Sequence, residues 1–211
     1  YAHELGLGVS TGIELVETTG NMSNAANHMD YAGTEWRIGD TLQAAIGQSD
    51  SVFTPLQLAE YCAAVANNGE RHSASILKSV RSYDYSEQIY DRQDEVLSTV
   101  ESPQYNWDAI HEGMKLVLND PINETNYLNF YDCAVTVAGK TGTAQKGEGI
   151  KNDGLFICYA PYEDPEIAVA VVVERGHAGA SVGFIARQII DVYLNIRSYS
   201  NTSESEMSLL K

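Results

Sequence analysis

The residues best equipped for chemistry are four neighbours, Lys140, Thr141, Gly142 and Thr143. They end an apolar run over 134–139, where a buried strand is expected to reach a cleft. A lysine there supplies a fixed cation, the glycine allows close approach to the backbone, and the threonines add hydroxyls and a backbone N–H. Together these groups can hold a carboxylate-bearing acyl substrate.

Several segments N-terminal to this motif also match a known family, in the same order along the chain. The segments 36–48 and 54–59 resemble the region upstream of the Lys-Thr-Gly motif of class B penicillin-binding proteins. Segment 107–114 resembles the helix before their motif strand, and residues 1–15 fit their lead-in. Over 1–197 the chain therefore resembles the C-terminal part of a D,D-transpeptidase domain of that family.

The resemblance implies a role for each motif residue. In the family a serine attacks a D-Ala-D-Ala carbonyl or a β-lactam, and a second peptide's amine resolves the acyl-enzyme. Carried onto this chain, Lys140 would support proton transfer and attract the substrate carboxylate. The hydroxyls of Thr141 and Thr143, which face one side of a strand, would bind that carboxylate. The Thr143 N–H would form half of the oxyanion hole, and Gly142 would leave room for the approach.

The chain departs from the family pattern at the nucleophile. The family's serine lies in Ser-x-x-Lys, with a second serine in Ser-x-Asn, and both are expected upstream of Tyr1. Ser75 and Lys78 fit Ser-x-x-Lys, but they follow a helix stop and lead into an extended segment. No Ser-x-Asn occurs in the chain. We therefore expect this chain to lack the nucleophile and to be inactive alone.

Several other interpretations remain or fail. A non-catalytic penicillin-recognising sensor, or a degenerate interaction domain of the same fold, is the main alternative. A β-lactamase is less favoured, because no water-activating glutamate motif can be placed. A phosphate-binding loop fails, because its first glycine would fall at Ala134 inside a strand and no helix pattern follows Lys140 and Thr141.

Composition limits the classes of binding partner that can be expected for this chain. The net charge of −16 over 211 residues argues against nucleic acid, which needs a basic face. No apolar run approaches the roughly 20 residues of a membrane span, so no membrane contact is expected within this chain. The resemblance implies an extracytoplasmic location at the bacterial membrane, with the anchor in the missing N-terminal part. It also implies peptidoglycan stem peptides and β-lactams as ligands.

The three cysteines form no metal or redox motif. Cys133 and Cys158 could form a disulfide. In an antiparallel hairpin of 134–143 with 154–160, however, Cys158 would fall opposite Lys140. This favours buried free thiols.

The remaining polar candidates are interpreted as structural. Asp40 and Gln48 match the family's segment and are expected to support the cleft. His177 is interpreted as a loop residue, with a place at the border of the cleft as the alternative. The other histidines share no metal-ligand spacing, so no metal or other cofactor is expected: His3, His28, His72 and His111.

Helices are predicted around the motif strand. The Thr-Pro-Leu-Gln sequence at Thr54 combines an N-cap, a first-turn proline and a capping-box glutamine, and predicts a helix to about residue 69. Apolar residues at helical spacing predict a second helix over 107–118. Ser181 is expected to cap a last helix over 181–196. The polar segment 198–211 is expected to be a disordered tail.

Strands are predicted at 134–143, 154–160 and 167–174, with the last at an unpaired edge. Helix, three antiparallel strands and helix describe an α+β fold, an antiparallel sheet flanked by helices, which agrees with the β-lactamase/transpeptidase-like fold of the family. Residues 1–35 read as irregular. The region 76–100 is expected to hold two extended segments, with tyrosines that cover a sheet face: Tyr83, Tyr85 and Tyr90.

Overall fold

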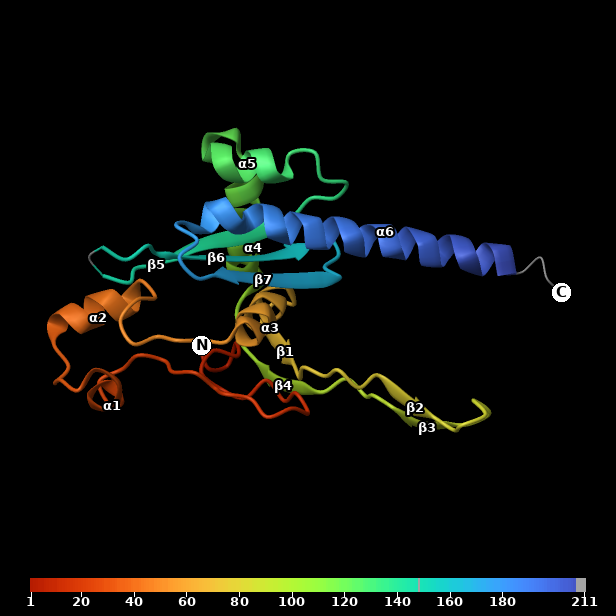
Figure 1. The fold of residues 1–211 in the computed structure, drawn as a ribbon, viewed down its shortest axis with the longest axis horizontal. Helices are drawn as coiled ribbons and strands as arrows, with labels where there is room; N and C mark the ends of the chain where they lie inside the picture. The colour runs from red at the N-terminus through yellow and green to blue at the C-terminus, as the bar shows by residue number, and fades with distance from the viewer. Residues whose placement is uncertain (148, 208–211) are drawn as a thin grey trace. The chain divides into compact units, whose positions relative to one another are not determined.

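The computed structural model describes the backbone of residues 1–147 and 149–207, and the side chains of the same residues up to 195. The chain divides into two compact units, Tyr1–Asp108 and Ala109–Lys211 (Figure 1). Each unit is described by itself. Among the described residues no helix has the length and apolar character needed to cross a bilayer.

The first unit holds three helices and four short strands in the described part of the chain. Two strand pairs form separate antiparallel two-stranded sheets, β1 with β4 and β2 with β3. Residues before α1 are irregular, as predicted, whereas the sequence did not predict α1 and α2. The elements are α1 (His28–Ala32), α2 (Ile38–Ala45), α3 (Pro55–Ala66), β1 (Glu70–His72), β2 (Ser79–Arg81), β3 (Gln88–Asp91) and β4 (Val96–Thr99).

Helix α3 begins where the sequence predicts. The Thr54 hydroxyl accepts the backbone N–H of Gln57 at 3.1 Å, and Gln57 Oε1 accepts the N–H of Thr54 at 3.0 Å. The fully buried Gln57 amide also donates to the carbonyls of Val9 and Thr19, at 2.7 and 2.8 Å. One capping residue therefore starts the helix and fastens the irregular N-terminal segment to it.

A small core forms around the end of α3. Trp107 packs with Leu5, Ala64 and Val100. At the turn after α3, Gly69 has φ of +92°, and a methyl group there would lie 2.5 Å from the Trp107 ring. Glycine is required at this turn for both its backbone conformation and its lack of a side chain.

A buried ion pair links α3 to β1. Arg71 Nη1 lies 3.4 Å from Glu60 Oε2, and both side chains are buried. Arg71 also donates to Ser98 Oγ at 2.9 Å and to the Ser10 carbonyl at 3.1 Å. Burial raises the pKa of Glu60 to about 7, although the positive charge of Arg71 acts against this shift.

The tyrosine-rich segment is a projecting hairpin. It forms β2 and β3, and the Tyr83 side chain is fully exposed, with Tyr85 75% and Tyr90 44% exposed. The prediction that these tyrosines cover a sheet face is wrong. A two-stranded ribbon has no second layer unless another element packs on it, and its aromatic side chains here remain open to solvent.

The second unit is a three-stranded sheet with helices. Helix α4 (Gln104–Asn119) enters it across the unit boundary. The strands lie in the order β5-β6-β7, with both pairs antiparallel. The other elements are the 3₁₀ turn η1 (Pro121–Asn123), α5 (Glu124–Phe130), β5 (Ala138–Ala144), β6 (Asp153–Ala160), β7 (Ile167–Val173), the 3₁₀ turn η2 (Gly179–Val182) and α6 (Gly183–Met207).

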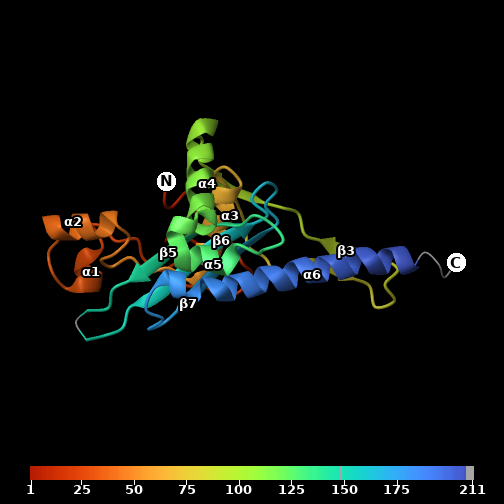
Figure 2. The same ribbon diagram turned by 90° about the horizontal axis from the view of Figure 1, so that it is seen from above.

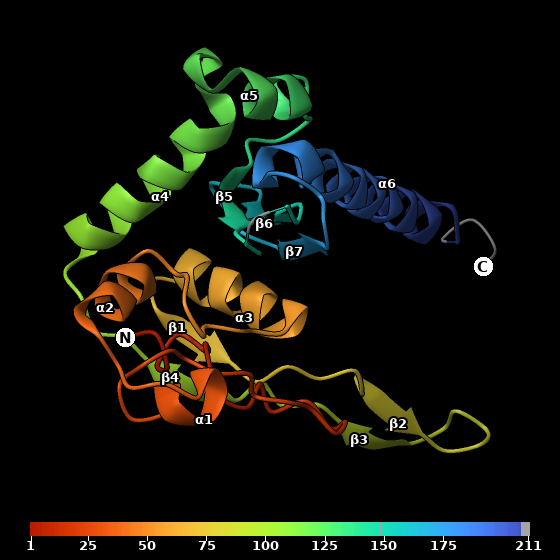
Figure 3. The ribbon, with the colours of Figure 1, turned by 60° about the vertical axis from the view of Figure 1, so that its left-hand side comes forward.

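Helices α5 and α6 cover one face of this sheet (Figure 3). Phe130 of α5 stacks on Phe156 of β6 with ring centroids 5.7 Å apart, and Ala186 and Ile190 of α6 are fully buried in the same cluster. Arg187 holds the two helices together through Asp132 Oδ1 at 2.7 Å and the Asn129 carbonyl at 3.1 Å. The α+β class, an antiparallel sheet flanked by helices, is confirmed.

Some predicted boundaries differ from the structure. Ser181 does not cap the last helix, because it lies inside η2 and α6 begins at Gly183. Helix α6 continues past the sheet to Met207, through most of the segment 198–211 for which a disordered polar tail was predicted (Figure 2). Once nucleated, a helix extends at the cost of one residue's freedom per hydrogen bond. Residues 208–211 lie outside the described part.

The hairpin register also differs by one residue from the prediction. Cys158 lies opposite Gly139, not Lys140. Cys62, Cys133 and Cys158 are free, with Cys62 and Cys158 buried and Cys133 half-buried. Free thiols are thus confirmed, although the pairing used to argue for them was wrong.

Candidate functional site

Strand β5 carries the whole Lys-Thr-Gly-Thr motif. It lies at one end of the sheet in the described part of the chain and pairs only with β6 there. Lys140 lies opposite Ile157, Thr141 opposite Phe156 and Thr143 opposite Gly154. The motif is therefore a rigid strand segment rather than a loop.

The two threonines share the face that α6 covers. Thr141 is half-buried and its partner Phe156 is a core residue, 1% exposed. Thr143, two residues further along, is exposed at the end of the strand. Alternation places Lys140 and Gly142 on the opposite face. The prediction that the two threonine side chains lie on one face of the strand agrees with this geometry.

Lys140 is exposed, and its amino group bends back over the strand. Nζ donates to the carbonyl of Thr141 at 2.7 Å. The Lys140 cation therefore lies beside the motif backbone.

The turn η2 lies directly against the motif. The N–H of Gly179 donates to Thr143 Oγ1 at 3.4 Å, and a methyl group on Gly179 would lie 2.5 Å from the carbonyl oxygen of Gly142. The sequence indicated only a glycine-rich connection over 176–179. Its contact with the motif depends on strand register, which the sequence pattern did not fix.

An ion pair closes the loop that follows β5. Lys146 Nζ lies 2.7 Å from Asp153 Oδ2, and the Arg175 N–H donates to Asp153 Oδ1 at 2.9 Å. The hydrogen bond from Lys146, with that from Arg175, lowers the pKa of Asp153, and the Asp153 carboxylate in turn raises the pKa of Lys146. Asp153 thereby fixes the start of β6, opposite Ala144 at the end of the motif strand.

Ser75 does not stand at a helix start. It lies in the irregular segment between β1 and β2, where its hydroxyl donates to the carboxylate of Glu14. This bond is the largest of several that lower the pKa of Glu14 to about 2. The local structure agrees with the interpretation of Ser75 as a non-catalytic serine.

The other polar candidates lie in irregular or capping positions. Asp40 accepts the N–H of Arg37 at 2.7 Å and caps α2, as a structural role requires. The Gln48 N–H bonds to the Gln43 carbonyl at 3.0 Å, just after α2. His177 is an exposed loop residue with φ of +69°.

Sequence reasoning missed the surroundings of His28. This buried side chain lies between two carboxylates. Its Nδ1 donates a hydrogen bond to Asp50 Oδ2, and its Nε2 lies 3.7 Å from Asp40 Oδ2. His28 and Asp50 are 22 positions apart, so no local sequence pattern indicated their contact. Within the described residues, no set of three or more His, Cys, Asp or Glu side chains is arranged to hold a metal ion.

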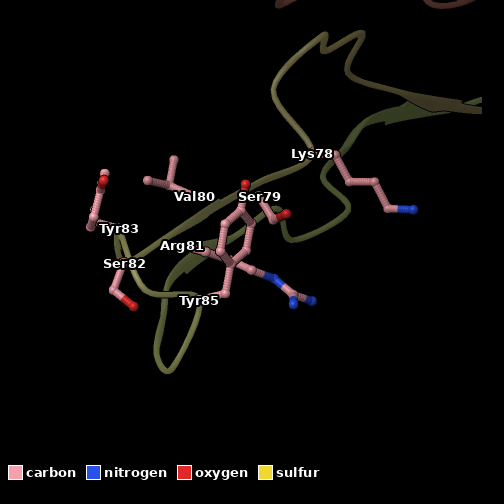
Figure 4. Close-up of a pocket in the computed structure, with 7 residues that line it drawn as sticks. All are labelled: Lys78, Ser79, Val80, Arg81, Ser82, Tyr83 and Tyr85. Atoms are coloured by element: carbon pink, nitrogen blue, oxygen red, sulfur yellow. The ribbon is translucent and has the colours of Figure 1, made fainter.

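An open pocket lies on the β2–β3 hairpin (Figure 4). Its side chains point apart, with Tyr83 and Ser82 on one side and Lys78 and Arg81 on the other. A small-molecule site needs polar groups that converge. This pocket does not have the arrangement of a catalytic site.

Known proteins resemble this chain over most of its length. The family model of the penicillin binding protein transpeptidase domain matches residues 1–191. The chain is 32% identical over 215 aligned residues to the peptidoglycan D,D-transpeptidase MrdA of Haemophilus influenzae, covering 93% of this chain and 32% of that protein. It thus spans about a third of the length of this relative.

Solved structures are similar in fold as well. The penicillin-binding protein PBP2 of Helicobacter pylori, solved in complex with MreC, has a TM-score of 0.76 at 27% identity, over 92% of this chain and 34% of that one. The imipenem acyl-enzyme of penicillin-binding protein A from M. tuberculosis has a TM-score of 0.69 at 27% identity, over 92% of this chain and 40% of that one. With a family model that matches most of its length, this chain belongs to the penicillin-binding protein transpeptidase family.

Proposed function

We propose that this chain supplies the substrate-binding strand of a peptidoglycan D,D-transpeptidase, a serine-type enzyme that cross-links stem peptides through an acyl-enzyme. The observation that carries the proposal is the complete Lys-Thr-Gly-Thr motif on the terminal strand β5. A strand at the end of a sheet can bind an extended peptide along its free edge. The name of the relative from H. influenzae agrees with this activity.

Each motif residue has a distinct task in this proposal. Lys140 attracts the carboxylate of the substrate and supports proton transfer near the nucleophile. The hydroxyls of Thr141 and Thr143 donate to that carboxylate. The N–H of Thr143 stabilises the oxyanion, a contribution of about 3 kcal/mol for one such donor.

The nucleophilic serine comes from sequence outside this chain. The relatives are about three times as long as the segment matched, and Ser75 lies in an irregular segment bound to Glu14. The same proposal places the protein at the extracytoplasmic face of the bacterial membrane, anchored by a segment outside this chain. β-Lactams would acylate that serine, as imipenem does in the solved acyl-enzyme of penicillin-binding protein A from M. tuberculosis.

Labelling with a fluorescent penicillin tests the proposal. The full-length protein should form one covalent adduct, whereas the 211-residue chain alone should form none by intact-mass spectrometry. An adduct on any serine of the isolated chain, Ser75 above all, would refute the assignment of the nucleophile. D-Alanine release from a D-Ala-D-Ala donor then separates the enzyme from a non-catalytic penicillin sensor, which is acylated without turnover of peptide.

A further inference from the structure

The turn η2 holds the motif strand through a residue without a side chain. A methyl group on Gly179 would lie 2.5 Å from the carbonyl oxygen and 2.6 Å from the nitrogen of Gly142, and closer still to the carbonyl oxygen of Leu155. Real Cβ atoms do not approach backbone atoms this closely, and backbone cannot swing aside as a long side chain can. Any larger residue at 179 would push η2 away from β5 and β6.

The restriction at Gly179 is one of space. Its φ lies outside the left-handed region that favours glycine, so alanine could adopt the same backbone conformation. Gly179 is also buried, and it sits where β5 and β6 are locked together, since Gly142 lies opposite Leu155. A substitution to alanine therefore tests the distance between η2 and the motif and little else.

The same residue contacts the hydroxyl that is proposed to bind substrate. The N–H of Gly179 points at Thr143 Oγ1, at a long 3.4 Å. A hydroxyl has one hydrogen and two lone pairs. A backbone N–H that donates to one lone pair limits the directions in which the hydroxyl can donate, and it strengthens the bond that the hydroxyl donates.

We infer that Gly179 is a positioning residue that directs the Thr143 hydroxyl toward the substrate carboxylate and keeps Gly142 in line with it. This inference rests on the proposed function. It adds that carboxylate recognition depends on η2, a segment outside the motif.

The direct test uses Gly179→Ala and a matched control, Gly183→Ala. Gly183 is four residues further along, and the three atoms that would lie nearest to a new methyl group there belong to side chains, the closest being Phe156 Cε2 at 3.2 Å. The readout is the second-order acylation rate of the full-length protein for a penicillin and for its methyl ester, which lacks the carboxylate. Gly179→Ala should lower the preference for the free acid about 100-fold, the scale of a displacement near 1 Å, and Gly183→Ala should leave it unchanged.

A double-mutant cycle shows whether Gly179 acts through Thr143. In a Thr143→Val background, Gly179→Ala should cause little further loss of acid-over-ester preference, because the hydroxyl that it directs is already gone. Equal losses in both backgrounds, or an unchanged preference in Gly179→Ala, would overturn the inference. A general loss of stability would lower both rates together and leave the ratio intact.

Amide hydrogen exchange on the full-length protein tests the geometry without any reaction. The Gly179 N–H should remain protected in Thr143→Ser, which keeps the hydroxyl, and exchange faster in Thr143→Val. Equal protection in the two variants would overturn the contact. If the unmodified full-length protein fails to react with penicillin, the proposed function is wrong. The contact between Gly179 and Thr143 is then tested by the hydrogen-exchange measurement alone.

Discussion

Thr141 lies directly opposite Phe156 in the β5–β6 ladder, so a residue of the motif is paired with a residue of the core. Phe156 is 1% exposed and stacks on Phe130. One strand residue away, Lys140 is exposed. The strand thus anchors its motif on the helix-covered face and leaves the cation accessible.

Thr143→Val should lower the acylation rate of the full-length protein by less than Lys140→Ala does. Valine removes a hydroxyl contact, worth about 1–3 kcal/mol when buried, but keeps the backbone N–H of the oxyanion hole. Second-order acylation rates measured with one penicillin show which substitution causes the greater loss. A greater loss for Thr143→Val would reverse the roles assigned to the two residues.

Gly139→Ala should destabilise the second unit by about 1–3 kcal/mol. A methyl group there would lie 2.6 Å from the Ile157 carbonyl oxygen and 3.0 Å from Leu118 Cδ1. Gly113→Ala on α4 is the matched control, because nothing lies within 4 Å of its new methyl and alanine favours the helix by about 0.5–1 kcal/mol. Urea unfolding of both variants checks this, and equal stabilities would contradict the packing described.

Glu60→Gln should change how stability depends on pH. Burial raises the native pKa of Glu60 to about 7 from 4.5, so the folded state holds this proton more tightly than the unfolded state does. As pH rises from 4.5 to 7, the unfolded chain releases this proton while the native protein still holds it, so stability falls. Glutamine has no proton to lose, so the variant should gain stability relative to the unmodified protein across this interval and no further above it.

Unfolding free energies measured between pH 4.5 and 8 test that prediction. Glu101→Gln, at an exposed position, is the control and should show a constant difference from the unmodified protein. The predicted account of Glu60 fails if its difference also stays constant with pH. It fails equally if the variant loses stability as pH rises, which would mean that attraction to Arg71 outweighs burial.

The sequence predicted the elements whose signals are local. The capping box at Thr54 and the apolar strands of the second unit were confirmed, because caps and runs of apolar residues act over a few positions. Asp120 before Pro121 is a helix-start signal, but it caps the turn η1, where its carboxylate accepts the N–H of Ile122 at 2.9 Å. Helix α5 itself was missed. Its seven residues were too short for a periodic pattern.

Long-range features could not be predicted in the same way. The register of β5 with β6 was wrong by one residue, because a hairpin's register depends on the path of the loop, and that loop contains Gly147 and Gly149 at positive φ. The contact of Gly179 with Gly142 follows from that register. The exposure of Tyr83 depends on the absence of a second layer over the hairpin, which no local pattern encodes.

Labelling of Lys140→Ala by a fluorescent penicillin tests the central claim most directly. Lys151→Ala is the matched control, because it removes a lysine from the exposed loop beyond the motif strand. The account predicts that full-length Lys140→Ala keeps its melting temperature, since Lys140 is exposed, but loses acylation, while Lys151→Ala is labelled normally. Near-normal labelling of Lys140→Ala would contradict the assignment of β5 as the substrate-binding strand.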